Sequence, residues 1–400
     1  MLSPYIVIRP TIEYEKRSSI SNFEILPEGR RPTHARDTHA PGRTTRSRPA
    51  REDVEATTDA PVTPPPVGDD QVVLVLPTSR NPPAFVVDRA ADRLRERFDV
   101  AVDRSPLLDA DDDPDPNAIA DALQAAFRDP DVGAVVAATG GDQQVRVLEH
   151  LDRSVLAASP TRFFGISDNT TLHCALQAAG VVSFYGGQCL PGLALDASLS
   201  AYTATYLERA LFADALGDVE PADSYTDDRY DFATGEPREW QPAPGWTWDG
   251  FDDPVTGRLW GGCLEVLEWV AAADPRGDLV PAGPPAHGDG RVLLLETSEE
   301  LPSAMHVRRV LQNLGVRGTL DALEAVVVGR PKTRHRDSPP HSERDAYRDH
   351  QRDAVRETIR AFADVPILFD FDVGHTDPHS PVPLGARVEL APENQTVTFH

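Results

Sequence analysis

The sequence predicts an α/β protein of two domains, an N-terminal α/β domain with a mainly parallel sheet and a C-terminal α/β domain. Short apolar runs alternate with amphipathic stretches through residues 71–188, which is typical of parallel strands joined by helices. The alternation starts again at residue 257 after an aperiodic stretch. A chain of 400 residues is long enough for two or three domains.

Each element of the first half has its own signal. The run QVVLVLPTSR (71–80) reads as a buried strand with a turn after it, and AFVVDRAADRLRERF (84–98) repeats apolar residues at helical spacing. The elements expected after these are a helix, turn and strand at 117–141, a strand, loop and helix at 162–180, and a strand at 181–188.

The second half begins with a helix after the Gly pair of GRLWGGCLEVLEWVAA (257–272). The elements expected after it are a strand, loop and helix at 290–315, a strand at 323–330, a polar, mobile insertion at 330–351, and a strand, a His-bearing loop and a hairpin at 365–399.

Composition sets the predicted boundaries. Residues 1–67 are Pro- and Arg-rich without an apolar period, which predicts a disordered extension or a start codon placed too early. The N-terminal α/β domain is then expected at 68–205 and the C-terminal one at 257–400. Residues 206–256, rich in Asp, Pro and aromatic residues, are expected to be a linker.

Charge is the strongest compositional signal. The net charge is −25, with 64 acidic against 39 basic residues, and only Lys16 and Lys332 are lysines. Such an excess of carboxylates resembles proteins of salt-loving archaea, in which high salt screens the self-repulsion. A GC-rich genome would explain the arginines but not the net charge. An acidic surface argues against nucleic-acid binding.

Other compositional features exclude further classes. No apolar run of about 18 residues predicts a membrane span, and no signal-peptide pattern opens the sequence. The three cysteines have no metal-ligand spacing and suggest no disulfide framework. We therefore expect a cytoplasmic chain without metal or cofactor.

The stretch VGAVVAATGGDQQVRVLEHLD (132–152) joins an apolar strand to a helical pattern through a Gly-Gly turn. Many hydrolases place their nucleophile at such a turn. Here the turn offers Asp142, Gln143 and Gln144, none of which has a hydroxyl or thiol. A plain strand–helix junction is the alternative interpretation.

Seven strings follow one another along residues 68–400: GGDQQ, GISDNTTL, FYGGQ, GRLWGGCLEVL, LLLETSEE, VVVGR and FDFDVGHTDPHSPVPLGARVEL. Their order resembles the LD-carboxypeptidase family of serine peptidases, including its microcin-immunity branch. The resemblance implies two domains with an active site between them. It also implies a Ser-Glu-His triad that cuts a peptide or amide bond near a free carboxylate, in cell-wall tetrapeptides or in acyl-sulfamoyl adenylates.

Carried over to this chain, the resemblance puts the acid at Glu296 and the base at His375, and the nucleophile position at Gln144. A serine needs the imidazole to take its proton, and the carboxylate to orient and stabilise that imidazole. The amide of Gln144 cannot form an acyl-enzyme. The residues assigned to substrate binding or to an oxyanion hole are Gly140, Gly141, Asp142 and Ser167.

Three functions remain open at this point. The first is a hydrolase in which His375 activates a water, or in which Ser79 or Ser167 replaces the missing serine. The second is a non-hydrolytic binding protein for a peptide or nucleotide-like carboxylate. The third is a partner-binding role. The expected partner is a small peptide or amide-type substrate, with no nucleic acid and no membrane, and a homodimer stays open.

Two geometric predictions follow from the carried-over triad. Glu296 and His375 should share a hydrogen bond across the domain interface although 79 positions separate them. Residue 144 should face the cleft at a helix start with free N–H groups nearby. Each residue also has a structural interpretation: a strand-end ion pair for Glu296, a helix cap for Ser167 and Asp168, and one of a metal-binding pair with His379 for His375.

Overall fold

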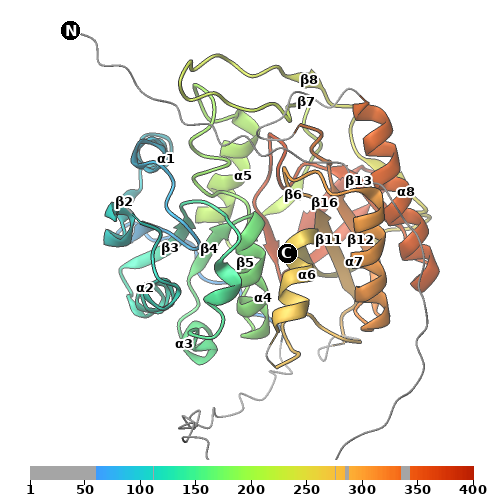
Figure 1. Cartoon of the computed structure of the whole chain (residues 1–400), viewed down its shortest axis with the longest axis horizontal. Helices are drawn as coiled ribbons and strands as arrows, with labels where there is room; N and C mark the ends of the chain where they lie inside the picture. The colour runs from blue at the N-terminus through green and yellow to red at the C-terminus, as the bar shows by residue number, and fades with distance from the viewer. Residues whose placement is uncertain (1–59, 111, 275, 284–287, 335–342) are drawn as a thin grey trace, which may run out of the picture. The chain divides into compact units, whose positions relative to one another are not determined.

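Two β-sheets, one built mainly from each half of the sequence, organise the chain (Figure 1). The computed structural model describes residues 60–110, 112–274, 276–283, 288–334 and 343–400. Both sheets are rich in parallel strands and are covered by helices. The predicted α/β class with two domains is confirmed.

The N-terminal sheet has the strand order β14-β5-β4-β3-β1-β2, in which β5, β4, β3, β1 and β2 are mutually parallel and β14 pairs antiparallel with β5. Alternate residues of β3 enter two separate core clusters: Val136 joins one and Val135 the other. The whole of β3 is therefore apolar and buried, as expected for a parallel strand with helices on both faces. The strands are β1 (Val72–Leu76), β2 (Ala101–Arg104), β3 (Val132–Ala137), β4 (Arg162–Gly165), β5 (Ser183–Tyr185) and β14 (Val382–Leu384).

Helices connect these strands, and α1, α2 and α4 lie at the predicted places, whereas α3 and α5 were not predicted. The apolar period of residues 84–98 forms α1 over the predicted range, and α2 begins behind Asp115, whose side chain accepts from the N–H of Asn117. The helices of this half are α1 (Ala84–Phe98), α2 (Pro116–Arg128), α3 (Arg153–Ala158), α4 (Thr170–Ala178) and α5 (Ala201–Phe212).

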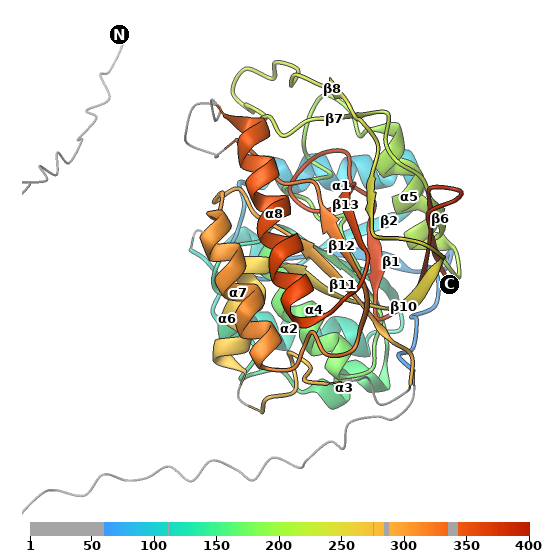
Figure 2. The ribbon, with the colours of Figure 1, turned by 90° about the vertical axis from the view of Figure 1, so that its right-hand side faces the viewer.

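The C-terminal sheet has the order β6-β16-β15-β10-β11-β12-β13-β9, with four parallel strands, β10 to β13, flanked by antiparallel ones. Figure 2 shows α6, α7 and α8 along one face of this sheet. The elements are β6 (Gly217–Val219), β9 (Thr247–Asp249), β10 (Val255–Cys263), α6 (Leu264–Ala273), β11 (Arg291–Glu296), α7 (Ala304–Val316), β12 (Leu323–Gly329), α8 (Arg344–Phe362), β13 (Ile367–Phe371), β15 (Arg387–Ala391) and β16 (Thr396–Phe399).

The last part of the chain returns to the first sheet. Strand β14 lies between β13 and β15 in sequence, yet it pairs antiparallel with β5 of the N-terminal sheet. One core cluster accordingly combines residues of both halves, such as Phe184, Leu384 and Val388. The C-terminal half thus contributes one strand, β14, to the N-terminal sheet, and the two sheets share a core.

Residues 60–67 correct the expected boundary of the N-terminal extension. Val62 and Val181 form a parallel bridge, and the guanidinium of Arg162 donates to the carbonyls of Pro64 and Pro65. These contacts make residues 60–67 part of the N-terminal half, because a Pro-rich chain can still be held through its carbonyl groups. Residues 1–59 lie outside the described part.

The segment 206–256 is more structured than a linker. It contains the end of α5 and two strands, β6 and β9, that form the two edges of the C-terminal sheet. The pairs β6–β16 and β9–β13 join strands far apart in sequence, so no local sequence pattern predicts these pairings. Two shorter strands, β7 (Ser224–Tyr225) and β8 (Gln241–Pro242), form a separate ribbon.

Three smaller expectations also change. The predicted helix after the Gly pair is present as α6, but the stretch before it is the strand β10. Residues 344–351, expected in a polar insertion, begin α8, and residues 335–342 lie outside the described ranges. The helical pattern after the first Gly-Gly turn forms a single 3-10 turn, η2 (Gln144–Arg146).

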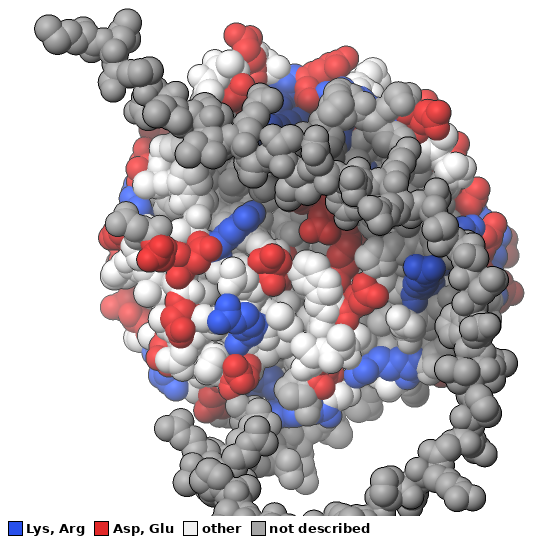
Figure 3. Space-filling view, in the orientation of Figure 1, with Lys and Arg blue, Asp and Glu red and all other residues white. Residues whose placement is uncertain are grey.

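Acidic side chains are spread over the surface. Figure 3 shows Asp and Glu on all parts of the visible face, interspersed with Lys and Arg. Among the described residues, no helix has the length and apolarity needed to cross a bilayer.

Candidate active site

A cavity of about 290 Å³ opens where the Gly-Gly turn faces the C-terminal half. The N-terminal half contributes Arg80, Thr139, Gly140, Gly141, Asp142, Ser167 and Pro191 to its lining. The C-terminal half contributes Cys263, Glu265, Val266, Trp269, Ser298, Glu299, Glu300 and His375. The cavity therefore brings together the turn and the loop that the sequence singled out separately.

Glu296 and His375 form a buried pair at this cavity. Glu296 ends β11, and its Oε2 lies 2.7 Å from Nδ1 of His375, in the loop after β13. The predicted hydrogen bond is thus confirmed, but it does not cross the domain interface as expected, because both partners belong to the C-terminal half. Gly374, at φ +90°, lets the loop pass closely, because a Cβ at this position would collide with the Glu296 carboxylate. The Tyr185 hydroxyl donates to Glu296 Oε1 at 2.6 Å, so both carboxylate oxygens have a partner.

Charge on the imidazole is favoured by its carboxylate neighbours. Burial opposes the charged form of His375, but the carboxylates of Glu296 and Glu299 outweigh it and raise the pKa of His375 to about 9. The second ring nitrogen, Nε2, lies 3.3 Å from Glu299 Oε2. At neutral pH the site therefore holds an imidazolium between two carboxylates.

Gln144 lies away from the cavity, which corrects the prediction that it faces the cleft. Only 1% of its surface is exposed, and it is absent from the cavity lining. Its amide nitrogen donates to the carbonyl of Thr78 at 3.2 Å and to Asn169 Oδ1 at 2.8 Å. Its amide oxygen accepts from the N–H of Leu172 at 3.0 Å. These bonds turn the side chain toward the start of α4.

The N–H groups expected to be free at this turn are also occupied. The main-chain N–H groups of Gln143 and Gln144 both donate to Asp168 Oδ2 at 3.0 Å. Asp168 is therefore not the cap of the following helix, because its carboxylate binds across to the Gly-Gly turn. Gly140, Gly141 and Asp142 do line the cavity, as predicted for that turn.

Ser167 is the residue of the first half that combines a hydroxyl, cavity exposure and an unusual backbone. It follows β4 and has φ +64°, in the left-handed region that a non-glycine residue rarely adopts. Its N–H donates to the Tyr185 hydroxyl at 3.1 Å, which in turn donates to Glu296. Among the described contacts, none engages its Oγ. Ser79, the other hydroxyl considered, lies 2% exposed behind the turn and accepts from the N–H of Gln143.

Comparison with known proteins gives this geometry a context. Residues 72–186 match the model of the LD-carboxypeptidase N-terminal domain, and residues 256–390 match that of the LD-carboxypeptidase C-terminal domain. The chain belongs to the LD-carboxypeptidase family. It is 27% identical over 280 residues to a probable murein peptide carboxypeptidase of Bacillus subtilis, covering 69% of this chain and 74% of that protein.

Two further proteins similar to this LD-carboxypeptidase family member belong to the microcin-immunity branch of the family. The microcin C7 self-immunity protein MccF of Escherichia coli is 22% identical over 287 residues, covering 68% of this chain and 74% of that protein. An MccF-like protein from Streptococcus pneumoniae, solved in complex with AMP, superposes with a TM-score of 0.71 at 24% identity. The superposition covers 82% of this chain and 98% of the Streptococcus pneumoniae protein. The superposition supports the fold.

The sequence did not single out several residues of this LD-carboxypeptidase site. Tyr185 ends the parallel strand β5, and only the tertiary structure brings its hydroxyl to Glu296, 111 positions later. Glu265 lies in the first turn of α6 and accepts from both the N–H and the hydroxyl of Ser298, while burial raises the pKa of its carboxyl. The clustering of Glu and Ser in LLLETSEE was the available signal for Ser298 and Glu299.

The metal alternative for the His loop finds no support in the part of the chain that the structure describes. No group of three or more potential ligands could hold a metal ion there. Instead, Nδ1 of His375 bonds to Glu296, and Asp377 pairs with Arg238 at 2.7 Å.

Gln144 should matter for stability. Replacing it with alanine leaves the Thr78 carbonyl, Asn169 and the Leu172 N–H without their partner and opens a small void. We expect Gln144→Ala to reduce the free energy of unfolding by about 2–4 kcal/mol in denaturant titrations. Gln143→Ala is the matched control, since Gln143 is half-buried and contacts Arg146 at the surface. Equal stability of the two variants would contradict the structural role of Gln144.

Proposed function

We propose that this chain is a hydrolase that cleaves a peptide or amide bond near a free carboxylate. The observation that carries the proposal is the buried Glu296–His375 hydrogen bond of 2.7 Å at a cavity that both domains line. A carboxylate bound to Nδ1 fixes the imidazole so that Nε2 is the atom able to exchange a proton with a substrate. Arg80, the guanidinium in the lining, supports binding of a substrate carboxylate.

The attacking hydroxyl in this proposal belongs to Ser167. Ser167 and His375 line the same cavity, and the strained backbone at Ser167 follows a strand and precedes a helix, as nucleophilic residues often do. Gln144 supplies no nucleophile, and its burial removes it from this role. Before Nε2 of His375 can accept a proton, entry of substrate has to displace Glu299 and the imidazolium has to release its own Nε2 proton.

The chemical steps are those of acyl transfer. Ser167 Oγ bonds to the substrate carbonyl carbon while its proton moves to His375 Nε2. The imidazolium then gives this proton to the amine as the C–N bond breaks, which leaves an ester on Ser167. Water hydrolyses the ester with the same proton transfers, releases the acid and restores the hydroxyl.

A binding function is the second candidate, and one observation favours it. The residue at the nucleophile position is buried as part of the fold, and the two N–H groups there are satisfied by Asp168. A cavity with an imidazolium and a guanidinium could hold a carboxylate without cleaving its neighbouring bond. The relatives named above give two ligand types to test, a murein peptide and a nucleotide.

A serine-directed fluorophosphonate probe tests the proposal. We expect the wild type to be labelled at Ser167, and Ser167→Ala and His375→Ala to abolish labelling. Ser298→Ala is the matched control, because Ser298 lines the same cavity but its hydroxyl donates to Glu265, so its loss should leave labelling intact.

The other outcomes separate the alternatives. Turnover of amide substrates without labelling would assign the attack to a water activated by His375. Ligand binding without either turnover or labelling would reject the hydrolase and establish the binding protein.

A further inference from the structure

We propose that Arg238 is a positioning residue for His375, because its guanidinium ties the His-bearing loop to the N-terminal domain. The catalytic part of this inference rests on the proposed function. Arg238 lies in the strap, residues 220–246, which connects α5 and β6 to the edge strand β9. Neither family match includes the strap, since the N-terminal match ends at residue 186 and the C-terminal match begins at residue 256.

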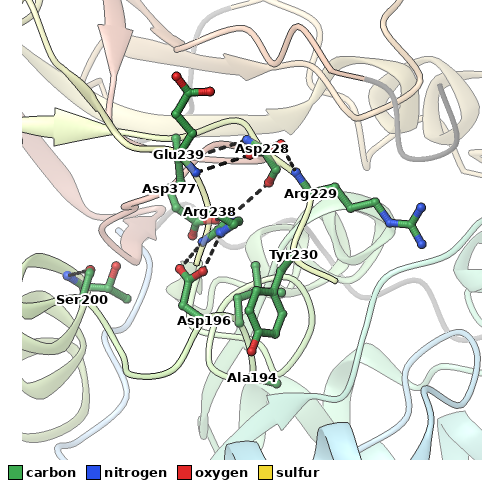
Figure 4. Close-up of polar contacts among 12 residues, drawn as sticks. Ala194, Asp196, Ser200, Asp228, Arg229, Tyr230, Arg238, Glu239 and Asp377 are labelled. Carbon is green, nitrogen blue, oxygen red and sulfur yellow. Dashed lines mark hydrogen bonds and ion pairs between the residues drawn. The ribbon is translucent and has the colours of Figure 1, made fainter. Parts of the chain in front are cut away.

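Arg238 forms ion pairs with two carboxylates, those of Asp196 and Asp377, and we call this arrangement the clasp. Its side chain is 4% exposed. Nε and Nη2 donate to the two oxygens of Asp196, at 2.8 and 2.6 Å, and Nη1 donates to Asp377 Oδ2 at 2.7 Å (Figure 4). The planar fork of a guanidinium fixes both carboxylates in distance and direction, which a lysine could not do.

The Asp196 end of this clasp is firmly held. Asp196 has φ +55°, and Arg93 of α1 donates to the carbonyls of Leu193, Leu195 and Asp196 at 2.5 to 2.6 Å. Three charge-assisted bonds to carbonyls within residues 193–196 leave this turn little freedom. Asp196 therefore provides a fixed point on the N-terminal domain.

The Asp377 end lies two residues after His375. The strap reaches the same loop a second time, because Thr226 and Asp377 exchange two main-chain hydrogen bonds, at 2.7 and 2.9 Å. The ring of His379 also lies 3.4 Å from Asp377. The segment that presents His375 to Glu296 is thus bound on one side by the strap and on the other by Glu296 itself.

The charge of Arg238 stabilises the ionised carboxylate of Asp377. Burial alone would raise the pKa of the Asp377 carboxyl, whereas Arg238 and His379 hold it well below its usual range. Without the guanidinium, the poorly solvated carboxylates of Asp196 and Asp377 would lie close together and repel each other. The loop can relieve this only by moving or by taking up a proton, and movement displaces His375.

The experiment compares Arg238→Met with Arg334→Met. Arg334 is the matched control, because it pairs with Asp227 and Asp228 of the same strap but not with the His loop. The first measurement needs no substrate: the low-field NMR resonance of the His375 Nδ1 proton, identified by its loss in His375→Gln, and the pKa of that ring. The second is the rate of fluorophosphonate labelling, measured well below the melting temperature of each variant.

In Arg238→Met we expect the Nδ1 resonance to broaden or shift and the His375 pKa to fall from about 9 toward 6.5. Labelling should slow about 100-fold, the effect of a misplacement of about 1 Å. Arg334→Met should leave all three unchanged, and Arg238→Lys should lie between. If Arg238→Met fails to fold, Asp377→Asn removes the same ion pair from the loop side.

Unchanged resonance, pKa and labelling in folded Arg238→Met would overturn the inference and leave the clasp a purely structural feature. If the wild type is not labelled at all, the proposed nucleophile fails, but the NMR measurements still decide the role of Arg238.

Discussion

Glu296→Gln is expected to slow amide hydrolysis by this chain about 10⁴-fold. The amide can still contact Nδ1 of His375, but it carries no charge to stabilise the imidazolium and allows the wrong tautomer. Loss of the carboxylate from a Ser-His-acid triad has an effect of this size. Steady-state kinetics on an amide substrate that the wild type hydrolyses provide the measurement.

Glu299→Gln serves as the control, because it removes the carboxylate at the other ring nitrogen. We expect it to change the rate less than tenfold. The base form of His375 exists above its pKa, so wild-type activity should rise with pH up to about 9. Removing either carboxylate lowers that pKa and moves the rise to lower pH. Equal losses in the two variants would show that Glu296 has no special role.

Molar salt is expected to raise the melting temperature of this chain by about 10 °C between 0.1 and 3 M KCl, which corresponds to a gain of a few kcal/mol. The net charge of −25 repels itself at low ionic strength, where the Debye length is about 10 Å, and is screened above 1 M, where it is about 3 Å. Carboxylates spread over the surface, as in Figure 3, contribute collectively to this repulsion.

A double variant tests whether the charge is the cause. Asp109 and Asp345 are mostly exposed, with 77% and 98% of their side chains accessible. Asp109→Asn with Asp345→Asn should reduce the salt-dependent gain without loss of structure by circular dichroism. A melting temperature that does not respond to KCl would remove the prediction of a salt-adapted protein.

Sequence reasoning reached the parts of this chain that depend on local pattern. The period of residues 84–98 defined α1, and the apolar run before the Gly-Gly turn defined β3, because burial on one face or on both leaves a direct trace in the residue types. The Glu296–His375 bond was reached through resemblance, since no local rule connects residues in β11 and in the loop after β13.

The failures have a common physical origin in long-range partners. Gln144 was expected to face the cavity, but its direction is set by hydrogen bonds to Thr78, Asn169 and Leu172. The strand β10 was missed because its Gly pair suggested only the start of a helix. Gly261 instead allows close pairing with β11, where any Cβ would collide with the carbonyl of Leu294.

The return of β14 to the first sheet has a consequence for how the chain is made. A ribosome delivers β5 long before it delivers residues 382–384, so during synthesis the edge next to Tyr185 waits unpaired. An open strand edge is a site for aggregation, and a nascent or prematurely terminated chain would present it. Quality control in the producing cell should therefore recognise any product that ends before β14, however complete its N-terminal half is.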